Sequence, residues 1–297
     1  MTIDKHDPEN ARAANVSRRD FIARSVAAGL VAATGQSFAA ALPAVETEVT
    51  VKTPDGSCDA AFIHPASGAY PGVIVWADAA GLRPTMRDMA KRLAADGYSV
   101  LVPNPFYRVS KAPQFTNAAN LDFKNQDLLT KIGTLMSSIG APGTVEKDAP
   151  AFVAFLDAQP QVNKAKKIGT QGYCMGGPLT MRTAAAVPNR IGAGGSFHGG
   201  GLVTDMPTSP HLLAPKIKAK FYFGIASNDD MRQPDAKDKL KAAFAAAGNP
   251  AEIEVYKERL HGWTVPDMPV QPMPIYHRPD AERAWTKLFA LYKTALV

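Results

Sequence analysis

Several features that would point directly to a function are missing from this sequence. It has no dense run of Lys and Arg, although the formal net charge is +6, so nucleic acid is not an expected partner and the scattered charge favours small substrates, including anionic ones. It also has no His-Glu-x-x-His motif and no clustered Cys and His spacing, so neither a metal nor another cofactor is expected. The Gly-x-Gly-x-x-Gly fingerprint does not follow the first buried strand, which argues against a dinucleotide-binding fold.

The N-terminal residues have the pattern of an export signal. Residues 17–22 (SRRDFI) have the twin-arginine form, a weakly apolar stretch follows at 26–33, and small residues at 37–41 offer cleavage sites. The apolar stretch is well below the ~20 residues that a spanning helix needs, so a cleaved signal is favoured over a membrane anchor. We predict that the twin-arginine export machinery carries the chain to the periplasm, where residues 1–41 are removed and 42–297 form one domain without a stable membrane span.

The rest of the chain alternates between short apolar runs and amphipathic stretches. This alternation predicts an α/β fold with a mainly parallel sheet and helices on both faces. Expected strands lie at 46–53, 58–64, 72–77, 98–103, 167–171, 192–197, 221–225 and 251–256, the first two as a hairpin. Expected helices lie at 84–96, 144–158, 175–187, 234–247 and 280–296, with a weaker one near 127–138. Residues 104–143 are the hardest to place and are a candidate substrate-covering segment.

Residues 172–177 (GYCMGG) are the most informative part of the sequence. They have the form of a nucleophile elbow with cysteine in place of the usual serine, and they stand between an expected strand and an expected helix. Small flanking glycines permit the tight turn that exposes the nucleophile, and the helix N-terminus favours a thiolate. We therefore interpret Cys174 as a nucleophile rather than as a buried cysteine in a Gly-rich turn. A disulfide with Cys58, the other cysteine, would abolish that role, so both are expected to be free thiols.

A thiol nucleophile needs a base, and the base needs an acid to orient it. His261 follows the last expected strand, where the base of such a triad enters. The acid should follow the preceding strand, where Asp229 and Asp230 are adjacent; we prefer Asp229, although either could reach a histidine and the other could cap the next segment. The expected oxyanion donors are the backbone N–H groups of Met175 and of Ala79, in the loop after the third strand.

These residues together resemble the dienelactone hydrolase family, cysteine-dependent members of the α/β-hydrolase fold. The matching segments are 76–81 (WADAAG), 98–104, 172–177, 223–228 and 261–262. The resemblance covers about residues 46–296. It implies that the protein hydrolyses an ester or lactone with Cys174, Asp229 and His261 as the triad.

The resemblance also implies roles for residues near the triad. Asp78 stands where the family has an acid that bonds the resting thiol until substrate displaces it, and Arg108 matches a basic residue that binds the substrate carboxylate. The family's second carboxylate-binding Arg, shortly after the catalytic histidine, is missing, so dienelactone itself is less strongly implied than hydrolysis. His198, at the end of the sixth expected strand, could bind substrate, neighbour Cys174 or simply complete the strand end.

Two alternative functions remain open at this point. A general carboxylesterase or thioesterase with an apolar acyl pocket would not depend on Arg108. An exported binding protein that has lost turnover would keep Cys174 only as a redox-sensitive thiol. The presence of nucleophile, acid and base together argues against this second alternative.

Overall fold

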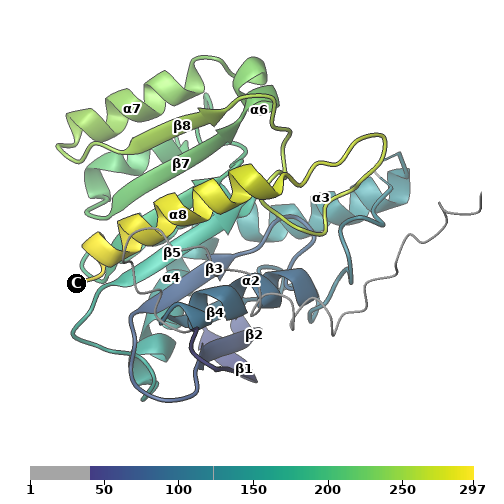
Figure 1. Cartoon of the computed structure of the whole chain (residues 1–297). Helices are drawn as coiled ribbons and strands as arrows, with labels where there is room; N and C mark the ends of the chain where they lie inside the picture. The colour runs from purple at the N-terminus through teal and green to yellow at the C-terminus, as the bar shows by residue number, and fades with distance from the viewer. Residues whose placement is uncertain (1–40, 123) are drawn as a thin grey trace, which may run out of the picture. The chain divides into compact units, whose positions relative to one another are not determined.

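The computed structural model describes residues 41–122 and 124–297. Their centre is an eight-stranded sheet with the order β1-β2-β4-β3-β5-β6-β7-β8, shown in Figure 1. The strands are β1 (Ala44–Thr53), β2 (Gly56–Pro65), β3 (Gly72–Trp76), β4 (Ser99–Pro103), β5 (Ile168–Tyr173), β6 (Ile191–Phe197), β7 (Lys220–Ala226) and β8 (Glu252–Tyr256). Strands β3 to β8 are parallel, whereas β1 and β2 form an antiparallel hairpin that pairs with β4. The predicted mainly parallel sheet and its opening hairpin are confirmed.

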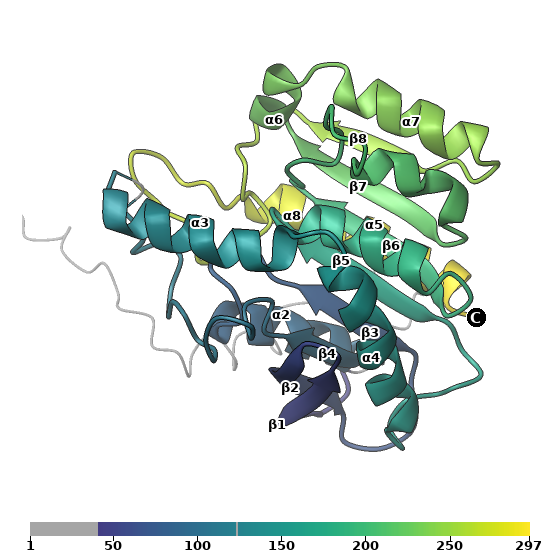
Figure 2. The ribbon, with the colours of Figure 1, turned by 180° about the vertical axis from the view of Figure 1, so that it is seen from behind.

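Helices cover both faces of the sheet, as the alternation predicts. Helices α2 (Pro84–Ala95) and α8 (Arg278–Ala295) lie in front of the sheet in Figure 1. The view from behind shows α4 (Thr144–Ala158) and α5 (Gly176–Ala186) over the opposite face (Figure 2), where α3 (Gln126–Gly140) and α7 (Ala236–Ala246) also contribute to the core. No helix in the described ranges is long and apolar enough to cross a membrane.

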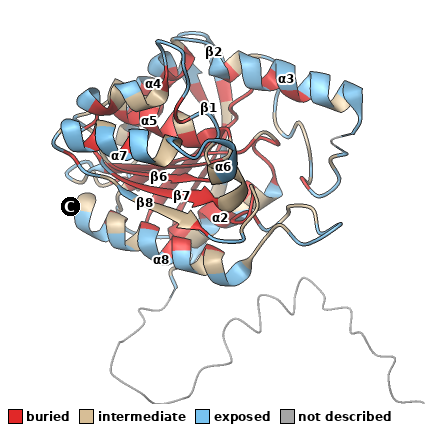
Figure 3. Cartoon of the chain, turned by 90° about the horizontal axis from the view of Figure 1, so that it is seen from above, coloured by how far each residue is buried: buried red, intermediate tan, exposed pale blue. Residues whose placement is uncertain are grey.

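Two hydrophobic clusters fill the space between the sheet and the helices. Because side chains alternate across a strand, Val73 and Val75 of β3 pack with α2 and α8, whereas Ile74 and Trp76 pack with α4 and α5. This explains why β3 reads as a continuous apolar run, since both of its faces are buried. Figure 3 shows the buried strands between helices that expose their outer faces.

The differences from the predicted elements concern two short helices. A 3-10 helix, η1 (Pro210–Lys216), and a short helix, α6 (Ser227–Arg232), were not among the expected elements. Helix α3 occupies the position of the weak helix, and Asn125 caps it by accepting hydrogen bonds from the N–H groups of Asp127 and Leu128. The predicted signal peptide falls almost wholly on residues 1–40, outside the described residues, so it stays a prediction.

Candidate active site

Cys174 lies in the turn between β5 and α5, at the carboxyl edge of the sheet. Its φ is 52°, in the left-handed region that is costly for a residue with a side chain. A Cβ on Gly172 would lie 2.1 Å from the carbonyl oxygen of Gly176, and a Cβ on Gly176 would lie 2.4 Å from that of Trp76. Only glycine fits such close approaches. The two glycines of the motif therefore allow the turn to close on itself and on the end of β3, and they leave Cys174 half-buried after a fully buried strand.

His261, in the loop after β8, lies between Cys174 and Asp229, which belongs to α6 after β7. The Nδ1 atom of His261 lies 2.7 Å from Oδ2 of Asp229, and the backbone N–H of His261 donates to Oδ1 of Asn228 at 2.9 Å. Asp230 is directed elsewhere, 2.7 Å from Nζ of Lys237. Of the two adjacent carboxylates, the structure therefore pairs Asp229 with the histidine.

The ionisation of His261 is set by these two neighbours. Burial alone would lower the pKa of His261, but hydrogen bonds with Asp229 and with the side chain of Cys174 outweigh it and raise the pKa to about 10. At neutral pH such a histidine is an imidazolium. Cys58, in contrast, is fully buried in β2, and both cysteines are free.

His198 lies at the end of β6 and is fully buried. Its Nδ1 atom accepts a hydrogen bond from the backbone N–H of Cys174 at 3.2 Å, and its Nε2 atom lies 2.8 Å from Oγ1 of Thr264. The contact with Cys174 agrees with one of the three roles considered for His198, that of a neighbour of Cys174. Thr264 carries no motif that could have identified it in the sequence.

Asp78 is held by a buried arginine that the sequence analysis did not identify. The Arg83 guanidinium contacts both oxygens of Asp78 at 2.6 and 2.9 Å and both oxygens of Asp267 at 2.7 Å. The backbone N–H of Ala118 also donates to Asp267 at 3.1 Å. An arginine in an apolar context just before a helix-starting proline was the available signal, because such a charge is buried only with partners. We call Asp78, Arg83 and Asp267 the ionic clasp.

One of the two predicted oxyanion donors, Ala79, lies in the turn around Asp78. Oδ1 of Asp78 accepts from the N–H of Ala80, and the carbonyl of Asp78 accepts from Gly81, both at 2.9 Å, so these hydrogen bonds do not use the N–H of Ala79. The close approach of Gly176 to the end of β3 brings this turn beside the residue that follows Cys174, Met175. Both predicted N–H groups therefore belong to loops that adjoin at the elbow.

Arg108 lies in a second ionic cluster. Its guanidinium contacts both oxygens of the fully buried Asp148 at 2.7 and 2.9 Å, and it contacts Oδ2 of Asp55 at 2.9 and 3.1 Å. The hydroxyl of Tyr107 donates to the same Asp148 at 2.7 Å. The structure thus directs most of the Arg108 donors to carboxylates of the protein itself.

A cavity of about 560 Å³ adjoins the elbow through Met175. Its lining is largely apolar and includes Met136, Pro142, Met175, Leu179, Met206 and Leu213. The two charged residues of this lining form an ion pair, with Nη2 of Arg182 2.6 Å from Oε2 of Glu146. The size and lining are those of a site for a small apolar group.

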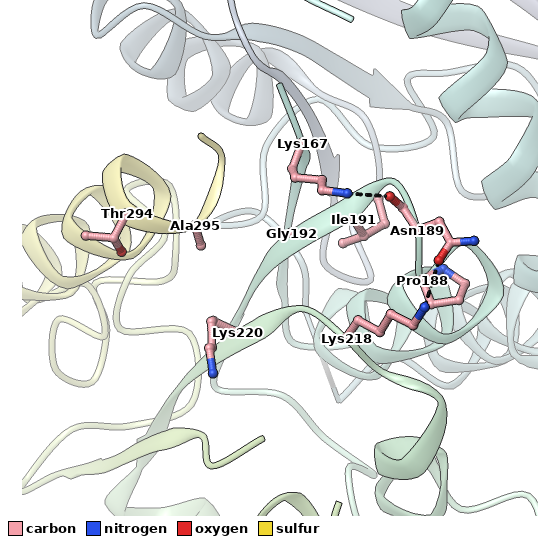
Figure 4. A pocket seen from close by; sticks show the side chains of 9 residues that line it. All are labelled: Lys167, Pro188, Asn189, Ile191, Gly192, Lys218, Lys220, Thr294 and Ala295. Carbon is pink, nitrogen blue, oxygen red and sulfur yellow. Dashed lines mark hydrogen bonds between the residues drawn. The ribbon is translucent and has the colours of Figure 1, made fainter. Parts of the chain in front are cut away.

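A second hollow, of about 520 Å³, lies at the opposite edge of the sheet (Figure 4). Lys167 and Lys218 both point to Asn189 there, at 2.8 Å from its carbonyl and 2.9 Å from its side-chain oxygen. None of the predicted site residues lines it. Within the described ranges, no group of three or more His, Cys, Asp or Glu side chains is arranged to hold a metal ion.

Comparisons with known proteins show the family to which the chain belongs. A model described as the dienelactone hydrolase family matches residues 58–296. A relative from Methylorubrum extorquens is 28% identical over 285 residues and covers 92% of this chain and 91% of its own. A relative from Rhodococcus opacus is 27% identical over 225 residues, with 73% and 82% covered. Both carry the name carboxymethylenebutenolidase, the first provisionally.

The fold has close counterparts among solved structures. A dienelactone hydrolase-like promiscuous phosphotriesterase from metagenomic libraries superposes with a TM-score of 0.67 at 24% identity, covering 85% of this chain and 99% of its own. The structure titled m3DLH gives a TM-score of 0.70 at 22% identity, with 86% and 99% covered. The predicted α/β-hydrolase fold is thereby confirmed.

Proposed function

Because the chain belongs to the dienelactone hydrolase family, we propose that it hydrolyses a carboxylic ester or lactone with Cys174 as the nucleophile. The observation that carries this proposal is the chain of contacts from Asp229 through His261 to Cys174, at a turn shaped as a nucleophile elbow. The names of the relatives support the same reaction class. A binding protein without turnover would have no need for all three groups in contact.

In the first half of the reaction the Cys174 thiolate attacks the carbonyl carbon, and the carbon–oxygen double bond becomes an oxyanion. The N–H groups of Met175 and Ala79 would donate hydrogen bonds to that oxygen, where their effect is greatest because charge develops there. The C–O bond to the leaving group then breaks, and His261 passes its proton to the departing alkoxide. The product is a thioester on Cys174, and in a lactone the alkoxide stays attached to the acyl group.

In the second half His261, now neutral, takes a proton from water while the resulting hydroxide attacks the thioester. Collapse of this second oxyanion releases the carboxylic acid and restores the thiolate beside the imidazolium. Asp229 would hold the imidazole with Nε2 toward the reacting atoms and stabilise its charged form.

The apolar cavity beside Met175 favours a second candidate, a carboxylesterase or thioesterase that takes a neutral acyl group. Its lining offers no unpaired charge, because Arg182 and Glu146 contact each other. The alternative, a lactone bearing a carboxylate, rests on the predicted roles of Arg108 and Asp78, and would require these residues to exchange their present partners. The two candidates differ in substrate and share the triad.

The test compares wild-type protein under reductant with Cys174→Ala on a carboxylated dienelactone, a neutral lactone, p-nitrophenyl acetate and p-nitrophenyl butyrate. We expect Cys174→Ala to lose at least about 10³-fold in kcat/KM, and mass spectrometry to find an acyl group on Cys174 of the wild type. Cys58→Ala, which removes the buried thiol of β2, is the matched control and should retain turnover. Equal activity of wild type and Cys174→Ala would refute the proposed nucleophile. Preference for butyrate over the dienelactone would favour the esterase.

We also propose that the twin-arginine pattern at residues 17–22 directs export to the periplasm. Support comes from the motif, the weakly apolar stretch and the small residues that follow it. N-terminal sequencing of the protein recovered from the periplasmic fraction would locate the cleavage. Recovery only from the cytoplasm with an intact N-terminus would contradict export.

A further inference from the structure

His198 occupies a constrained position beside the nucleophile. Its φ of 40° lies in the left-handed region, where Asn, Asp and His are the non-glycine residues most often found. Its backbone N–H donates to the carbonyl of Gly224 at 2.7 Å. The side chain is fully buried, so it has no surface with which to touch a substrate. A histidine held in a costly conformation without access to substrate calls for a role inside the protein.

The turn that carries His198 holds both backbone polar groups of Cys174. The N–H of Cys174 is shared between the carbonyl of Phe197, at 3.1 Å, and Nδ1 of His198, at 3.2 Å. The carbonyl of Cys174 accepts from the N–H of Gly177 in α5 at 3.0 Å and from the N–H of Gly200 at 3.3 Å. The turn after β6 and the start of α5 therefore hold the peptide groups of Cys174 together, and His198 is the side chain that takes part.

The other ring nitrogen of His198 reaches the loop that carries the base. Thr264, whose Oγ1 lies 2.8 Å from Nε2 of His198, is buried and stands three residues after His261. The rings of His198 and His261 are 5.0 Å apart between centroids and meet edge to face at 66°. One imidazole thus contacts both the residue of the nucleophile and the loop of the base.

These contacts fix the chemical form of His198. Nδ1 faces an N–H donor and must supply a lone pair, so in the neutral ring the hydrogen is on Nε2 and is donated to Oγ1 of Thr264. An imidazolium would direct an N–H at the N–H of Cys174. Burial, and then the positive charge of the neighbouring His261, lower the pKa of His198 well below 6.5, in agreement with the neutral form.

We propose that His198 is a positioning residue that fixes the distance between the Cys174 thiol and the His261 imidazole, through the amide of Cys174 and the hydroxyl of Thr264. This inference rests on the proposed function, because the positioned groups are the proposed nucleophile and base. It assigns His198 no contact with substrate. Displacement of a reacting group by about 1 Å can cost about 10²-fold in rate, which sets the expected size of the effect.

The test uses variants that separate the two contacts. His198→Leu removes both, whereas His198→Asn tolerates the left-handed backbone and can place Oδ1 near the N–H of Cys174. Thr264→Val removes only the hydroxyl at nearly constant shape. His64→Asn is the matched control, because His64 is a buried histidine of β2 that contacts the carbonyl of Pro65. The acylation rate with p-nitrophenyl acetate is measured in the stopped flow, per thiol titrated by the burst of p-nitrophenol.

We expect acylation to slow by about 10²-fold in His198→Leu, to recover at least about ten-fold of this loss in His198→Asn, and to slow by about 3–10-fold in Thr264→Val. The binding constant for the ester, obtained from the concentration dependence of the acylation rate, should change little in each, and His64→Asn should match the wild type. A weaker binding constant for the ester at an unchanged limiting acylation rate would instead show substrate contact and overturn the proposal, as would equal acylation rates for Leu, Asn and wild type.

Two results keep this inference separate from the proposed function. If wild-type protein forms no acyl group on Cys174, the proposed function itself fails. If the wild type is acylated and the His198 variants acylate equally fast, only the positioning role is overturned. Should His198→Leu not fold, the decision rests on His198→Asn and Thr264→Val, both of which the proposal requires to lower the limiting acylation rate without weakening the binding of the ester.

Discussion

Two parts of the carboxyl edge of the sheet hold their polar groups in opposite ways. In the reacting half (Cys174, Asp229 and His261), the thiol is half-buried and the side chain of His261 is 30% exposed, so a substrate can reach both. In the ionic clasp, Arg83 is fully buried between two carboxylates. The reacting half is therefore accessible from the surface, whereas the charges of the ionic clasp are paired with one another inside the protein.

The ionic clasp and the reacting half therefore have different roles. The ionic clasp joins three segments that are distant in the chain, namely the loop after β3, residue 118 and the loop after β8. Asp267 stands six residues after His261, so the clasp anchors the loop that presents the base. A buried guanidinium with two bidentate partners has few donors to offer to a substrate, but it resists displacement. The charges of the ionic clasp therefore hold the loops in place, whereas the charged groups of the reacting half take part in the reaction.

Substitution of Asp229, the acid of the reacting half, should lower the rate of the reaction strongly. Asp229→Asn should lower kcat by about 10³–10⁴-fold, because the amide no longer favours an imidazolium and can hold the wrong tautomer of His261. Asp230→Asn is the matched control, since Asp230 pairs with Lys237 and should change kcat less than about three-fold. Steady-state rates with p-nitrophenyl acetate measure both. A larger loss in Asp230→Asn than in Asp229→Asn would reverse the assignment of the acid.

The elbow and the ionic clasp also differ in how far the sequence predicts them. The elbow was predictable because its constraints are local: a strand, a tight turn and a helix must follow one another, and glycines are needed where backbone approaches backbone. The order of sheet and helices followed from apolar periodicity. The location of His261 and of the acid followed from their places after the last two strands of the predicted sheet.

Long-range pairing was not predictable in the same way. The partners of Asp78 are Arg83, five residues on, and through it Asp267, whose closeness arises only when the loops after β3 and β8 fold together. Arg108 likewise meets Asp148 of α4 and Asp55 of the β1–β2 turn. The sequence shows which charges exist, but their pairing depends on tertiary contacts between segments that no local pattern links.

Loss of the ionic clasp should lower the free energy of unfolding more than it lowers the rate of the reaction. Arg83→Met leaves Asp78 and Asp267 without their cation, and we expect the free energy of unfolding to fall by about 3–5 kcal/mol, measured by urea denaturation. Arg87→Met is the matched control, because Arg87 pairs with Glu46 and Glu48 near the surface and should cost about 1 kcal/mol or less. Equal losses in the two variants would contradict the structural role given to the clasp.

Arg108 is expected to contribute little to the turnover of either substrate. Arg108→Gln should change kcat/KM less than about three-fold, or about 0.7 kcal/mol, for p-nitrophenyl acetate and for the carboxylated dienelactone alike, because most donors of the Arg108 guanidinium are already directed to Asp55 and Asp148. Lys147→Gln is the control for charge, since Lys147 contacts the same Asp55 at 3.0 Å. A loss of ten-fold or more confined to the dienelactone and to Arg108→Gln would show that Arg108 exchanges its protein partners for the substrate carboxylate. In that case the cluster around Arg108 would belong with the reacting half, as a binding site that opens when an anionic substrate arrives.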